Sequence, residues 1–66
     1  MYAVISEYVN FYNPEYNECD IISFHISLNL AKEKVNELKD TDEYVNLRAH
    51  EKIIFRIVKM DVVEEA

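Results

Sequence analysis

The stretch IIFRIVKMDVV, residues 53–63, is the strongest β-strand signal in the chain and sets the architecture. Seven of its eleven residues are isoleucine, valine or phenylalanine, whose stiff or bulky side chains fit a pleated sheet better than a helix. Both faces of such a strand are apolar, so we predict a strand that is central or has its second face covered. Alternation places Ile53, Phe55 and Ile57 on one face of this strand. It places the other five residues on the opposite face: Ile54, Arg56, Val58, Met60 and Val62.

Two shorter strands precede this stretch. Residues 2–9, YAVISEYV, and residues 21–26, IISFHI, alternate as strands do. Between them, residues 10–20, NFYNPEYNECD, have the asparagine, proline and acidic residues typical of a long hairpin connection. In the second strand, alternation predicts one face of Ile22, Phe24 and Ile26 and another of Ile21, Ser23 and His25.

A helix is expected after the second strand. Ser27 fits its N-cap, where the hydroxyl accepts a hydrogen bond from a free backbone amide. Apolar residues then recur at three- and four-residue spacing, which predicts a stripe against the sheet and an end near Lys39. Residues 40–51 leave two alternatives open, a short helix within 42–48 and an irregular loop. The apolar stripe consists of Leu28, Ala31, Val35 and Leu38.

The order strand, strand, helix, strand predicts one α+β domain over residues 1–66. A hairpin makes the first two strands antiparallel, and a right-handed crossover through the helix makes the third parallel to the second. We expect a three-stranded, mainly antiparallel β-β-α-β sheet of order 2-1-3. One helix covers only one face, so we expect a symmetric homodimer through the other face or a sheet edge. The predicted dimer interface consists of Ile54, Val58, Met60 and Val62.

Two motifs carry a family resemblance. The helix reads S-x-x-x-A-K at Ser27, Ala31 and Lys32, and the final strand reads EKIIFRIVKMDVVEE over residues 51–65. With the other strands they resemble small strand-strand-helix-strand domains of unknown function from bacteria and phages. The resemblance covers most of the chain and implies the fold, but it carries over no activity and no catalytic residue.

Charge is unequally distributed along the chain. Thirteen acidic and seven basic residues give a formal charge of -6, which argues against direct binding to nucleic-acid phosphates. The first 31 residues hold four acids and no lysine or arginine. The single cysteine fits a reducing compartment, and no stretch is long enough to span a bilayer. We therefore expect a cytoplasmic protein without a membrane partner, in the host cytoplasm if a phage encodes it.

Few residues could bind a metal or act as a nucleophile. Cys19, Asp20, His25 and His50 are the only mixture of that kind, and they lack Cys-x-x-Cys and His-x-x-x-His spacing. The neighbouring acids at 18–20 and 40–43 lie in polar stretches that we expect to be solvated. Paired carboxylates act as a general acid and a general base only where burial moves their protonation equilibria apart. We predict no catalytic residue, no metal site and no cofactor, and a protein that is not an enzyme.

An acidic and aromatic surface in the N-terminal half is the remaining candidate site. Tyrosine supplies a large contact area with a polar tip, and spaced acids can imitate nucleic-acid phosphates in the basic groove of another protein. The alternative is that the aromatic rings fold over the sheet edge and complete a thin core. The predicted partner-binding residues are Glu7, Tyr12, Glu15, Tyr16, Glu18 and Asp20.

These features favour a small acidic, non-enzymatic interaction protein. Heavy use of asparagine, lysine, isoleucine, glutamate and tyrosine is typical of an AT-rich bacterial or phage genome. We expect it to bind a host protein, such as one that itself binds nucleic acid, and to inhibit or redirect it, with mimicry of nucleic-acid charge as one means. The alternatives are a homodimeric structural or assembly module without an inhibitory role and a regulator that binds a metabolite at the dimer interface.

Overall fold

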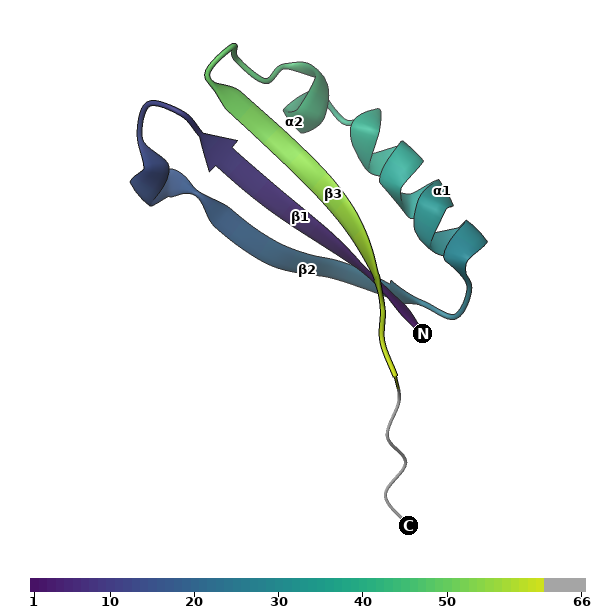
Figure 1. The fold of residues 1–66 in the computed structure, drawn as a ribbon. Coiled ribbons are helices and arrows are strands. Elements are labelled where there is room, and N and C mark those ends of the chain that lie inside the picture. The colour runs from purple at the N-terminus through teal and green to yellow at the C-terminus, as the bar shows by residue number, and fades with distance from the viewer. Residues whose placement is uncertain (62–66) are drawn as a thin grey trace.

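A three-stranded antiparallel sheet forms the centre of the structure, a computed structural model that describes residues 1–61. Strand β1 (Tyr2–Asn10) lies between β2 (Glu18–His25) and β3 (Glu51–Lys59) and is antiparallel to both (Figure 1). The outer strands therefore run parallel to each other. The predicted α+β fold with strand order 2-1-3 is confirmed.

Helix α1 (Leu28–Lys39) lies against one face of the sheet (Figure 1). Its N-cap is Ser27, as predicted, and the Ser27 Oγ accepts a hydrogen bond from the Leu30 backbone N–H at 3.2 Å. Ala31 is fully buried, and Val35 and Leu38 are half-buried. The spacing of these three residues places them on one side of the helix, so they form the stripe that packs on the sheet. Leu28, the fourth predicted member of the stripe, is 40% exposed.

A single helical turn, α2 (Asp42–Val45), follows α1 and settles the choice between helix and loop in favour of a short helix. The Thr41 hydroxyl does not cap this turn, because it donates a hydrogen bond back to the Leu38 carbonyl at 2.7 Å. Instead, Tyr44 packs against Phe55 of β3 with ring centroids 5.7 Å apart. This aromatic contact anchors α2 on the same face of the sheet as α1.

The connection between β1 and β2 is a short loop built on asparagine side chains. The Oδ1 of Asn10, a residue only 7% exposed, accepts hydrogen bonds from two backbone N–H groups of the loop. The Oδ1 of Asn17 in turn accepts a hydrogen bond from the Asn10 backbone N–H at 2.7 Å. Between them Pro14–Tyr16 form a 3-10 helix, η1. The predicted connection over residues 10–20 is too long, because residues 18–20 pair with β1 and β2 begins at Glu18.

A β-bulge in β2 changes which of its side chains share a face. The pairing with β1 passes from Ser23 to Ile21 and leaves Ile22 without a partner. Because the extra residue breaks the alternation, Ile21 and Phe24 lie on one face. Ser23 and His25 lie together on the other face, with the Ser23 Oγ 2.7 Å from the His25 Nε2. The predicted faces, which placed Ile21 with Ser23 and Ile22 with Phe24, are therefore wrong.

The third strand is offset from its prediction. It covers Glu51–Lys59 rather than residues 53–63, because its last pair is Lys59 with Tyr2, the first residue of β1. Met60 lies just past the strand, where its backbone N–H donates to the Met1 carbonyl at 2.8 Å. Val62 lies outside the described residues.

The face of the sheet opposite α1, here called the open face, has no covering element among residues 1–61 (Figure 1). The only fully buried apolar residues in the described chain are Ala3, Val4 and Ala31, and of these only Val4 and Ala31 lie on the helix-bearing side of the sheet, so the core between β1 and α1 is thin. Pairing places three cross-strand rows on the open face: Phe24, Ala3 and Val58; Ile21, Ile5 and Arg56; and Cys19, Glu7 and Ile54.

Candidate binding groove

A groove of about 460 Å³ lies on the helix-bearing face of the sheet, between the hairpin end of β2 and the turn that joins α1 to α2. It forms because α1 leaves part of this face uncovered. Every element of the described chain contributes at least one residue to it. The lining residues are Ser6, Tyr8, Glu15, Tyr16, Glu18, Asp20, Ile22, Leu38, Thr41, Glu43, Tyr44, Ile53 and Phe55.

The floor of the groove is aromatic and aliphatic. Tyr8 of β1 stands opposite Ile53 of β3, and Phe55 lies two residues further along β3 on the same face. Tyr44 approaches from α2 and packs on Phe55 at an interplanar angle of 35°. Tyr16 of η1 joins the lining from the hairpin side and is largely exposed. Ring faces carry partial negative charge, so a floor of this kind attracts cations as well as apolar groups.

The rim of the groove is acidic. Glu18 and Asp20 project from β2 to the same side because they are two residues apart in a strand. Glu15 adds a third carboxylate from η1 and Glu43 a fourth from α2, and all four residues are exposed. No lysine, arginine or histidine is among the lining residues. The two ion pairs found within residues 1–61 involve none of these carboxylates, so the rim has a negative potential without a local counter-charge.

A hydrogen-bond network holds Tyr8 in place at the hairpin end of the floor. The Tyr8 hydroxyl donates to the Glu51 Oε2, and the Arg48 backbone N–H donates to the Glu51 Oε1 at 3.1 Å. The hydrogen bond to Glu51, and then burial, raise the pKa of Tyr8. The hydrogen bonds from Tyr8 and from the Arg48 backbone lower the pKa of Glu51. This network therefore fixes the Tyr8 ring at the hairpin end of the groove floor.

Four of the six predicted partner-binding residues come together at the groove, and two do not. Glu15, Tyr16, Glu18 and Asp20 line it. Tyr12 stacks on His50 with ring centroids 4.8 Å apart and stays 78% exposed. The sixth residue, Glu7, lies on the open face and forms an ion pair with Arg56 at 3.0 Å.

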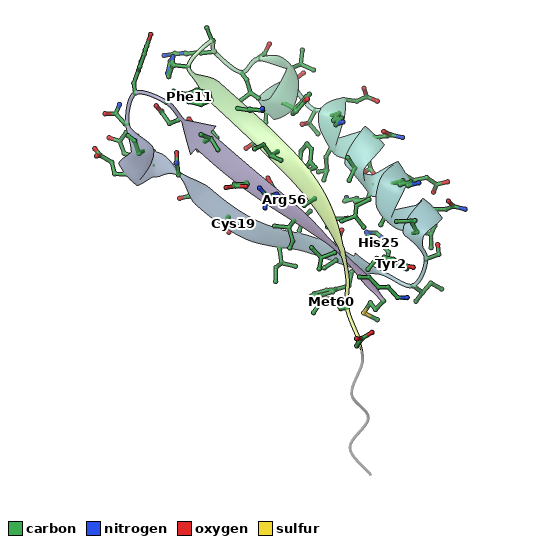
Figure 2. The ribbon with its side chains drawn as sticks, in the orientation of Figure 1. Tyr2, Phe11, Cys19, His25, Arg56 and Met60 are labelled. Carbon is green, nitrogen blue, oxygen red and sulfur yellow. The ribbon has the colours of Figure 1, made fainter. Side chains whose placement is uncertain are left out.

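The loop rings do not cover the sheet edge. Phe11, Tyr12 and Tyr16 all remain mostly exposed, so the alternative in which these rings complete the core is wrong. Figure 2 places Phe11 at the hairpin end of the sheet and Met60 at the opposite end, with Arg56 and Cys19 on the strands between them. Of these three rings, only Tyr16 lines the groove.

The aromatic floor and Glu43 were missed by sequence reasoning. Tyr8 and Phe55 alternate onto the helix-bearing face, which signals burial under a helix rather than a groove. Tyr44 and Glu43 belong to the segment for which helix and loop were both open. A four-residue helix docked by one aromatic contact leaves no strong periodic signal in the sequence.

The predicted dimer residues fall in three places. Ile54 and Val58 lie on the open face. Met60 follows the end of β3 and is 42% exposed. Val62 is not among the residues that the structure describes.

Residues 1–61 contain no group of three or more histidine, cysteine or acidic side chains placed to hold a metal ion. The groove itself presents four carboxylates on its rim and ring faces on its floor, groups that interact favourably with organic cations.

No family model, curated protein or solved structure matches the chain. Among the helices of residues 1–61, none combines the length and the apolar composition needed to cross a bilayer. The geometry of the groove and of the open face therefore carries what can be inferred about function.

Proposed function

We propose that this chain is a small, acidic, non-enzymatic binding protein, encoded by a phage or mobile element, whose groove takes up basic side chains of a host protein and thereby inhibits or redirects it. The observation that supports this proposal is a rim of four carboxylates without a local counter-charge around an aromatic floor. A lysine or arginine side chain matches both features. Its apolar stem can lie on the rings while its charged head meets the rim.

The size of the groove favours one or two side chains rather than a larger ligand. About 460 Å³ lies at the lower end of the range for small-molecule sites. The lining offers acceptors on its rim and apolar surface on its floor, and it offers no cationic donor for a phosphate or a carboxylate ligand. A protruding basic residue of a protein surface fits this combination, and a nucleic acid does not.

Nucleic-acid mimicry is the finer form of this proposal. Glu18 and Asp20 are two strand residues apart, about 7 Å along β2, and Glu15 continues the acidic edge into η1. A protein that binds nucleic acid presents lysine and arginine to such an edge, and complementary potential speeds their encounter. A structural or assembly role without inhibition is the alternative function, and it depends on the open face rather than on the groove.

The proposal is tested by a pull-down with the tagged chain from a nuclease-treated lysate of the bacterial host, followed by affinity measurement with the captured protein. A Glu15→Lys, Glu18→Lys and Asp20→Lys triple variant should weaken binding about 100-fold at low salt, since reversing each charge costs about 1 kcal/mol. Added salt should weaken binding of the wild type in the same direction.

A matched control has the same change in net charge away from the groove. The triple variant Glu33→Lys, Asp40→Lys and Asp61→Lys alters three exposed acids, none of which lines the groove. It should retain affinity within about threefold. Equal loss in both triple variants would mean that only total charge matters, and retained affinity in the groove variant would remove the groove from the proposal.

A further inference from the structure

The open face carries large exposed apolar side chains and lacks cover within the described chain. Its outer strands expose three large apolar side chains, Ile21 at 60%, Phe24 at 53% and Val58 at 42%. Ile5 and Ile54 lie among them and are half-buried. Such a continuous exposed patch in a small domain marks a surface that packs against another molecule.

The distribution of charge favours a second copy as the occupant and an open-face-to-open-face orientation. Glu7 and Arg56 neutralise each other within the open face at 3.0 Å, and Lys52 lies at its hairpin end. The four carboxylates of the groove all belong to the opposite face. Two copies of a chain with a formal charge of -6 therefore repel each other least when their open faces meet. A two-fold axis can also bring the Glu7 of each copy toward the Arg56 of the other.

The area of the face sets the size of the interface that two copies can form. Three strands of up to nine residues cover roughly 30 by 14 Å, or about 400 Å² in plan before the relief of the side chains is counted. Buried on two copies, this plan area is about 800 Å², and the relief of the side chains has to supply the remaining third of the roughly 1,200 Å² at the lower end of specific interfaces. The thin core, with three fully buried apolar residues, is also the condition in which small domains gain stability from association.

We propose that two copies pack open face to open face as a symmetric homodimer, which buries Ile21, Phe24 and Val58 between two sheets. The result is a four-layer arrangement of helix, sheet, sheet and helix, with the sheets about 10 Å apart. This interface uses Phe24 and Ile21 of β2, which the bulge places on the same face, together with Ile54 and Val58 of β3.

Sedimentation equilibrium of the full chain tests the proposal directly. The wild type should form a dimer at micromolar concentration. Phe24→Asp or Val58→Asp should raise the dimer dissociation constant at least about 100-fold, because a two-fold interface loses each apolar contact twice. The control Val45→Asp changes a residue that is 66% exposed and belongs to α2, on the opposite side of the sheet, and it should leave the dissociation constant within about threefold. A wild type that remains monomeric at 100 µM would overturn the proposal, as would a dimer that both open-face variants leave intact.

The thiol of Cys19 provides a second measurement that needs no variant. Cys19 is exposed, is the only cysteine of the chain, and stands opposite Glu7 on the open face. Its rate of reaction with a disulfide reagent should fall as protein concentration rises through the dimer dissociation constant. A rate that does not change with concentration would exclude a second copy as the cover of this face.

Discussion

The hydrogen bonds of Asn10 make the hairpin loop a sensitive point of the fold, and Asn10→Ala measures their contribution. The Asn10 Oδ1 accepts hydrogen bonds from the backbone N–H groups of Tyr12 at 3.0 Å and Asn13 at 2.9 Å. Each such bond contributes about 0.5–1.5 kcal/mol, so the variant should lose about 2 kcal/mol of unfolding free energy. A 66-residue domain has only about 3–10 kcal/mol in total.

Two further asparagines of the loop provide a graded comparison. The Asn17 Oδ1 accepts one hydrogen bond, from the Asn10 backbone at 2.7 Å, so Asn17→Ala should cost about half as much. The Asn13 side chain forms no hydrogen bond with the helix that it precedes, so Asn13→Ala should change stability by less than about 0.5 kcal/mol.

Urea denaturation followed by circular dichroism gives these values at one fixed protein concentration, with equal m-values as the check on two-state unfolding. The expected order of loss is Asn10→Ala, then Asn17→Ala, then Asn13→Ala. An Asn13→Ala variant that loses as much as Asn10→Ala would refute the assignment, because residue type rather than hydrogen bonding would then explain the effect.

Two more predictions concern the groove network and the helix cap. Since the pKa of Glu51 is held below its ordinary 4.5, its stabilising effect is present above pH 4.5 and is lost as pH falls through the lowered pKa. Glu51→Gln should therefore flatten the pH dependence of stability below pH 4.5, and an unchanged acid-unfolding curve would contradict this. Ser27→Ala removes the N-cap bond to Leu30 and should cost about 1 kcal/mol in urea denaturation. Ser27→Asp, which keeps an acceptor at the cap, should cost much less; equal losses would show that the cap contributes nothing.

The helix and the strand order were predictable from sequence because local and global signals agree. Ser27 starts α1 at the position that its apolar spacing requires. The run of β-branched residues in β3 fits only a strand, and a hairpin followed by a right-handed crossover leaves few ways to order three strands. Secondary structure can be predicted from sequence where propensity, capping and topology agree in this way.

The course of β2 was not predictable, because it depends on the neighbouring strand. Alternation assumes a constant period of two, and the bulge at Ile22 shifts this period by one residue. The polar residues 18–20 have turn composition, yet they join the sheet because Tyr8, Glu7 and Ser6 provide ladder partners. Neither effect has a signature within β2 itself.

The acidic rim of the groove was predictable from sequence, and its aromatic floor was not. Its acidic rim lies mainly in one stretch of sequence, from Glu15 to Asp20, and composition alone identifies that stretch. Its floor brings together Tyr8, Tyr44 and Phe55, which come from three separate elements. Their meeting depends on how α2 docks on β3, and this is a tertiary contact rather than a local preference.

The two faces of the sheet separate the two proposed interactions, and this separation determines the shape of any complex. Tyr8 lies in the groove, while its neighbour Glu7 lies on the open face. In a pair joined at the open faces, both grooves point outward, so partner binding does not compete with dimerisation. Two sheet layers about 10 Å apart stand between the grooves, and a single compact partner cannot reach both of them. Such a pair would link two partner molecules rather than hold one by two sites, so it would gain no avidity from a single partner.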